Sequence, residues 1–97
     1  MPTYIILIKM TEQGIKNVND LPNRVQSARL AFEKAGAKWL DWNLTMGQYD
    51  AVGKVEFPDD YTAAAVVLAL GKLGNARTTT LRAFTEAEMK KIVEKIP

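Results

Sequence analysis

Residues 3–10 (TYIILIKM) constrain the fold most, because this expected strand is apolar on both of its faces. Tyr4, Ile6, Ile8 and Met10 point one way, while Ile5 and Leu7 point the other way and only Lys9 interrupts the second set. Leaving such side chains in water forgoes about 1.5–3 kcal/mol each. We therefore expect both faces of the strand to be covered, one by this chain's own helices and the other by a further partner.

The remaining elements follow from hydrophobic periodicity and turn residues. We expect strands at residues 38–46, 51–57 and 76–84 and a loop at 11–20. One helix should run from Pro22 to Gly36, a second from an N-cap at Asp59 to Gly74, and a third from the capping box Thr85–Glu88. This order is β-α-β-β-α-β plus a C-terminal helix. It predicts an α+β, ferredoxin-like domain with a four-stranded antiparallel sheet and both main helices on one face.

The open face of that sheet is the surface that lacks a cover. Two arrangements would supply one: a two-fold dimer that packs the open faces together, or the C-terminal helix folding back over Ile5 and Leu7. The alternation of residues 38–46 places Trp39 and Trp42 on opposite faces. Polar strand residues make the open face mixed, as in a dimer seam that encloses a ligand space: Lys9, Asp41, Asn43, Lys54, Glu56 and Thr79. Each of them is individually more typical of a solvated or edge-protecting charge.

Composition excludes several function classes. The 97 residues suit one domain, residues 1–97, and contain no cysteine and no histidine. Thiolate chemistry is therefore absent, as is the commonest general base near neutral pH, and no metal site or cofactor is expected from the dispersed acids. The net charge of +2 is scattered, so nucleic acid is not an expected partner. No segment resembles a signal peptide or a bilayer span, which favours a cytoplasmic protein without membrane contact.

Four residues are candidates for a ligand site. Tyr49 and Asp50 follow Gly47 in the expected hairpin, where the hydroxyl could donate to a carbonyl or carboxylate and the aspartate could orient it or act as a base. The alternative is a turn in which Gly47 takes a positive φ and Asp50 accepts backbone N–H groups. Arg77 and Thr78 could bind a carboxylate or phosphate, or Arg77 could pair with an acid at a dimer rim. Tyr4, Trp39, Trp42 and Phe84 are interpreted as core or interface residues.

Five segments in this order resemble the GYD-domain family, which belongs to the wider set of dimeric α/β-barrel folds. They are PTYIILIK (residues 2–9), GQYD (47–50), FPDD (57–60), GNART (74–78) and LRAFT (81–85), and they span nearly the whole chain. The sequence departs from the family at Gly53 and Lys54, where the family is more uniformly apolar. The resemblance implies a dimeric barrel but no settled activity. Relatives of this fold include metal-free monooxygenases, lactone isomerases, haem enzymes and ligand-sensing domains.

Two functional classes therefore remain open. The first is a homo-oligomeric module that binds a small organic ligand or another protein, or only builds an assembly. The second is a metal-independent enzyme, similar to a monooxygenase or an isomerase, in which Tyr49, Asp50 and Arg77 contact a small organic substrate. The sequence does not decide whether the chain is an enzyme.

Overall fold

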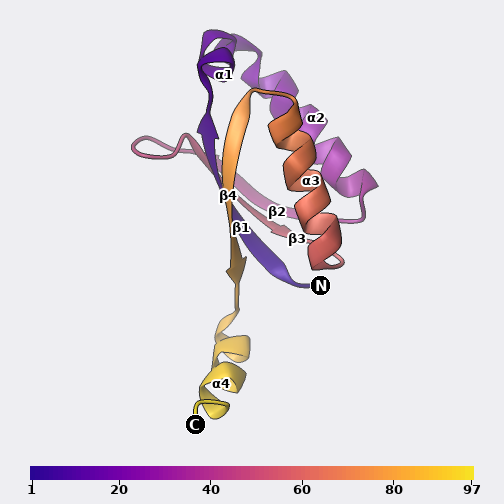
Figure 1. Ribbon diagram of the computed structural model, residues 1–97, viewed down its shortest axis with the longest axis vertical. Helices are drawn as coiled ribbons and strands as arrows, with labels where there is room; N and C mark the ends of the chain where they lie inside the picture. The colour runs from indigo at the N-terminus through magenta and orange to yellow at the C-terminus, as the bar shows by residue number, and fades with distance from the viewer.

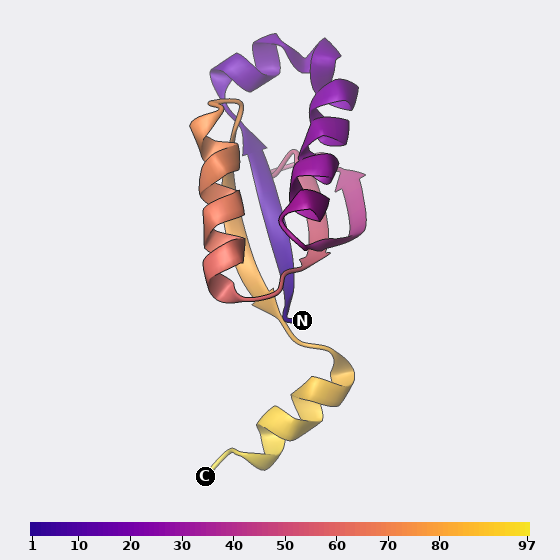
Figure 2. The same cartoon turned by 90° about the vertical axis from the view of Figure 1, so that its right-hand side faces the viewer.

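Strand β1 lies in the centre of the sheet, as a strand that is apolar on both faces should. The computed structural model describes residues 1–97. Its four strands, β1 (Thr3–Met10), β2 (Lys38–Leu44), β3 (Ala51–Glu56) and β4 (Ala76–Ala83), form one antiparallel sheet in the order β2-β3-β1-β4. Helices α2 (Leu21–Lys34) and α3 (Asp60–Lys72) cover one face of it (Figure 1, Figure 2). The predicted ferredoxin-like arrangement is confirmed.

The core lies between that face and the two helices. Tyr4 and Ile6 point into it from β1, beside Val55 of β3 and Phe32 of α2. Phe57 is completely buried, and its ring packs at 5.5 Å from the rings of both Tyr4 and Phe32. Burying aromatic side chains in this way supplies a large share of the stability of a small domain. The predicted division of β1 is confirmed for Tyr4 and Ile6, and Ile8 of the same set packs against this core.

The predicted helix ends are also confirmed. Asp59 caps α3 by accepting the Thr62 amide at 2.7 Å, and Thr85 with Glu88 forms the complete capping box of α4 (Glu86–Glu94). Beyond the last turns of α2 and α3, Gly36 and Gly74 have φ values of +87° and +83°. A side chain at either position would be strained in this left-handed conformation.

The expected loop at residues 11–20 was wrong, because this segment forms a short helix α1 (Glu12–Lys16) and a 3-10 turn η1 (Val18–Asp20). Thr11 caps α1 by accepting the Gly14 amide at 3.1 Å. The chain was expected to be irregular because Gly14 lowers helix propensity and the segment is polar. A side-chain cap and tertiary contacts override that preference here.

The prediction that Trp39 and Trp42 lie on opposite faces of β2 was also wrong. A bulge between Trp39 and Asp41 shifts the register, so that Trp39 pairs with Val55 and Trp42 pairs with Gly53. Val55 and Gly53 lie opposite Tyr4 and Ile6, so both tryptophans lie on the helix-covered face. Strict alternation predicted that the two tryptophans lie on opposite faces. The extra residue at the bulge, Leu40, shifts the alternation by one position, so that both lie on the same face.

Helix α4 projects beyond the end of the sheet and does not fold over its open face (Figure 1, Figure 2). The long dimension of the molecule is 49 Å as a result. The alternative in which α4 covers Ile5 and Leu7 of its own chain is therefore wrong, and these side chains stay partly exposed.

Candidate functional site

The open face of the sheet combines an apolar centre with polar neighbours. By strand register, Ile5 and Leu7 share this face with Val52 of β3 and Leu81 of β4. Leu81 is 44% exposed. Lys54 stands opposite Ile5, and Thr79 stands opposite Leu7. The mixed character that the sequence predicted for this face is present, with an apolar patch that no element of the chain covers.

A second exposed apolar surface lies on the helix side of the molecule. Only Ala63 of α3 is buried, although this helix is apolar around most of its circumference. Tyr61 is 90% exposed, and Leu68 is 74% exposed. A helix that is hydrophobic all round is normally buried on all sides. The outer face of α3 therefore has the character of an interface rather than of a solvated surface.

Tyr49 and Asp50 lie at the end of the β2–β3 hairpin, next to the carboxyl end of β1. The Asp50 carboxylate accepts the Met10 amide at 2.7 Å, and the Asp50 amide donates to the Ile8 carbonyl at 2.8 Å. The Tyr49 carbonyl accepts the Thr45 hydroxyl at 2.7 Å. Gly47 has a φ of +109°. These contacts are those of the turn interpretation, in which Asp50 satisfies backbone N–H groups.

By strand register Arg77 and Thr78 start from opposite faces of the edge strand β4, although the Arg77 guanidinium reaches α3 beside Gly71. Thr78 pairs with Ile8 and lines a cavity on the helix side, whereas Arg77 pairs with Lys9 and is exposed. The four candidate residues therefore share one end of the sheet, but the structure brings only Thr78 into a cavity. Their roles in ligand binding stay predictions.

The cavity lies between the sheet and helix α2 and has a volume of about 110 Å³. Its walls are mostly apolar, and both tryptophans line it beside Gly53. A groove of about 510 Å³ between α2 and α3 adjoins it and shares several of its lining residues, including Phe32 and Leu70.

Arg24 of α2 lines both the cavity and the groove, and sequence reasoning missed it. A signal was available, because Arg24 falls three residues after Leu21 and four before Ala28, on the apolar stripe of the helix. A basic residue at such a position is either paired or available to a ligand.

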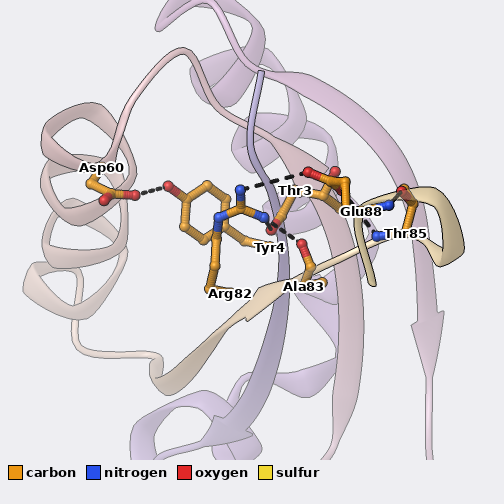
Figure 3. A network of polar contacts seen from close by, with 7 residues as sticks. All are labelled: Thr3, Tyr4, Asp60, Arg82, Ala83, Thr85 and Glu88. Carbon is orange, nitrogen blue, oxygen red and sulfur yellow. Dashed lines mark hydrogen bonds and ion pairs between the residues drawn. The ribbon is translucent and has the colours of Figure 1, made fainter. Parts of the chain in front are cut away.

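A polar network joins β1, β4 and the starts of α3 and α4 (Figure 3). The hydroxyl of the buried Tyr4 donates to Asp60, and this hydrogen bond, together with burial, raises the pKa of Tyr4 above its ordinary value. Arg82 lies over the Phe84 ring at 4.4 Å, donates to the Thr3 carbonyl at 3.3 Å, and pairs with Glu88 at 3.9 Å. The network fixes the point at which α4 leaves the sheet.

The structure contains neither a membrane-spanning helix nor a cluster of metal-ligating side chains. No helix combines the length and the apolar character needed to cross a bilayer. No three acidic side chains are grouped so that they could hold a metal ion.

Comparison with known proteins gives a family match and a curated relative. The model of the family described as "GYD domain" matches residues 4–93. A protein of Thermus thermophilus named "Glutamine synthetase and cystathionine beta-lyase binding protein" is 31% identical over 90 residues, covering 92% of this chain and 95% of the relative. No solved structure matches the chain.

Proposed function

The chain belongs to the GYD domain family, and from this premise we propose that it is a self-associating module that binds another protein. The name of the Thermus relative describes a protein that binds two enzymes. The observation that carries the proposal for this chain is the exposed apolar face of α3, where Leu68 and Tyr61 are held in water. An apolar patch on a soluble domain is typical of a protein–protein interface.

Self-association is assigned to the open face of the sheet. Ile5, Leu7, Val52 and Leu81 form an apolar patch that α4 of the same chain leaves uncovered. A second copy related by a two-fold axis would present the same patch and cover it. This is the dimeric-barrel arrangement that the family resemblance implies, and it accounts for a central strand that is apolar on both faces.

The α3 face is then free for a different protein. α2 and α3 pack on one face of the sheet and leave the other face open (Figure 2). Leu81 belongs to the open face by register, so a dimer formed there leaves Leu68 and Tyr61 of α3 accessible. Aromatic and aliphatic side chains in such a position are the usual anchors of protein interfaces. We therefore assign the enzyme partner to α3 and the second copy to the sheet.

Leu68→Lys and Leu81→Lys form a matched pair of variants that separates the two surfaces. The probes are purified glutamine synthetase and cystathionine β-lyase from the organism that encodes this chain, with binding measured by biolayer interferometry. We expect the wild-type protein to bind at least one of them, and Leu68→Lys to weaken that affinity by about ten-fold or more. Leu81→Lys should instead lower the molar mass measured by light scattering at micromolar concentration.

Three results would contradict the proposal. The first is a wild-type protein that binds neither enzyme, and the second is a Leu68→Lys variant with wild-type affinity. The third, a wild-type monomer at micromolar concentration, would remove the assignment of the open face. Thermal unfolding of both variants verifies that a loss of binding does not come from a loss of the fold.

A further inference from the structure

The cavity beneath α2 contains a positive charge that no group of the protein neutralises. Nη2 of Arg24 donates to the Gly14 carbonyl at 3.1 Å. Nε and Nη1 of the same guanidinium are shielded from solvent and have no hydrogen-bond partner. No carboxylate oxygen lies within ion-pair distance of Arg24. Shielded N–H groups of a charged side chain are costly when unpaired, so this arrangement favours an anion at the site.

Arg29 lies about one and a half turns further along α2 and also has an unpaired guanidinium N–H group. Its Nε is also shielded and unpaired, but its guanidinium lies over the Trp39 ring, 5.3 Å from the centroid. The ring face supplies a compensating electrostatic contact. Arg29 does not line the cavity, and Arg24 has no comparable aromatic partner.

The walls of the cavity determine which kind of anion fits. Trp39, Trp42 and Ile6 offer apolar surface, and Gly53 beneath Trp42 leaves space that a side chain would occupy. The volume of about 110 Å³ is somewhat less than the roughly 150 Å³ of an engineered apolar cavity that admits benzene. The occupant is therefore compact and largely apolar.

Arg24 supplies the one guanidinium of the cavity, and a ligand with a single negative charge is sufficient to pair with its free N–H groups. Asp41 and Lys54 also border the cavity, but they pair with each other in the sheet, and Lys54 stands opposite Ile5. By register both side chains therefore belong to the open face and do not set the charge of the cavity. Thr78 adds a hydroxyl on the β4 side of the cavity.

We propose that this cavity binds a small monocarboxylic acid with an aromatic or branched apolar body. The carboxylate accepts hydrogen bonds from the unpartnered N–H groups of Arg24, and the body lies between the two tryptophans above Gly53. Arginine suits this role because its planar guanidinium matches carboxylate geometry. The site goes beyond the protein-binding proposal, and it lies apart from the open face of the sheet.

Benzoate is the probe, and benzamide is its neutral counterpart of nearly the same shape. Titration calorimetry and tryptophan fluorescence on the full chain should give saturable benzoate binding with a Kd of about 1 mM or tighter. Benzamide should bind about ten-fold more weakly or worse. Arg24→Gln should weaken benzoate by about ten-fold or more, while Arg29→Gln, a matched loss of charge on the same helix, should stay within about three-fold.

Gly53→Val gives a second variant, which fills the cavity and leaves Arg24 in place. A Cβ at residue 53 would lie 3.5 Å from Trp42 Cδ1, an ordinary contact, so the backbone tolerates a side chain there. We expect loss of benzoate binding with a retained cooperative thermal transition.

Three results would each overturn the proposal: equal affinity for benzoate and benzamide, no effect of Arg24→Gln, or no benzoate binding at millimolar concentration. So would loss of affinity in Arg77→Gln with Arg24→Gln unaffected, which would move the anion site to the Arg77 guanidinium at the edge of the sheet. Since the assay uses this chain alone, its failure is distinct from a failure to bind partner enzymes.

Discussion

The carbonyl oxygen of Asn75 packs directly against the Cα of Gly14, so that a Cβ at residue 14 would overlap it. The Thr11 amide donates to this same oxygen at 3.0 Å, and the Thr11 hydroxyl donates to the Gly74 carbonyl at 2.6 Å. The start of the short helix α1 is therefore held against the connection between α3 and β4 by these hydrogen bonds. Because Gly14 also accepts a hydrogen bond from Arg24, the position of α1 is coupled to that of the cavity arginine.

Gly14→Ala is expected to lower the free energy of unfolding by about 1–3 kcal/mol, since backbone must move to admit the methyl group. Alanine has the higher intrinsic helix propensity, so a loss of stability here is opposite to the propensity effect. Gly71→Ala in α3 is the control. Its Cβ would lie 3.5 Å from Arg77 Nη1, an ordinary contact, and we expect it to be neutral or to stabilise by up to about 1 kcal/mol. Urea denaturation of both variants measures the difference, and equal stabilities would contradict the close contact.

The Tyr4–Asp60 hydrogen bond makes stability depend on pH in the alkaline range. The pKa of Tyr4 in the folded protein is raised above the ordinary value of 10.0, chiefly by this bond. Between the unfolded and the folded pKa, the unfolded chain loses the phenol proton and the folded chain keeps it. The free energy of unfolding therefore falls as pH rises through about 10 toward the folded pKa.

Tyr4→Phe tests this dependence because it removes the titrating hydroxyl and keeps the buried ring. We expect the variant to be less stable near pH 8 by about 0.5–1.5 kcal/mol. The difference should shrink as pH rises above 10, since the other titrating groups are common to both proteins. Denaturation at pH 8, 10 and 11 measures it. A difference that stays constant over this range would contradict a raised pKa for Tyr4.

Asp50 is expected to act on stability through the Met10 amide. Asp50→Ala leaves that half-buried N–H without its carboxylate and should cost about 1–3 kcal/mol. Tyr49→Phe serves as the control, because the contact made by Tyr49 is through its backbone carbonyl, and it should change the free energy of unfolding by less than about 0.5 kcal/mol. Thermal unfolding compares the two. A stable Asp50→Ala variant would favour the ligand-contact interpretation of this residue instead.

The features of the fold that depend on local sequence could be predicted. Asp59 and Thr85 cap helices as their residue types indicate, and Gly36, Gly47 and Gly74 adopt the positive φ that glycine permits. The apolar residues of β1 divided correctly between its two faces because a regular strand has a period of two. Such features involve residues close together in the chain, so a single sequence contains the necessary information.

The features that depend on distant contacts could not be predicted. The bulge at Trp39 and Asp41 is defined by pairing with β3, and no turn residue marks it. Helix α1 forms in spite of Gly14 because it packs on Asn75, sixty-one positions further along the chain. Arg24 lies on a predictable apolar stripe, but its unpaired N–H groups became evident only once β2, β3 and α1 surrounded it. Thr78 lines the cavity and its neighbour Arg77 does not, a difference that depends on the pairing of β4 with β1.

Helix α4 depends on its N-terminal capping box more than the other helices do. It spans nine residues, and its apolar stripe, which includes Met89 and Val93, is 42–55% exposed. A helix of this length is marginal without tertiary packing. Thr85→Ala should therefore lower the hydrogen-exchange protection of the α4 amides by about five-fold, equivalent to about 1 kcal/mol, and leave β1 unchanged. Glu86→Gln changes the first turn outside the capping box and is the control, with an expected effect below about two-fold. Unchanged protection of α4 in Thr85→Ala would show that contacts with a second copy, rather than the capping box, hold this helix in place.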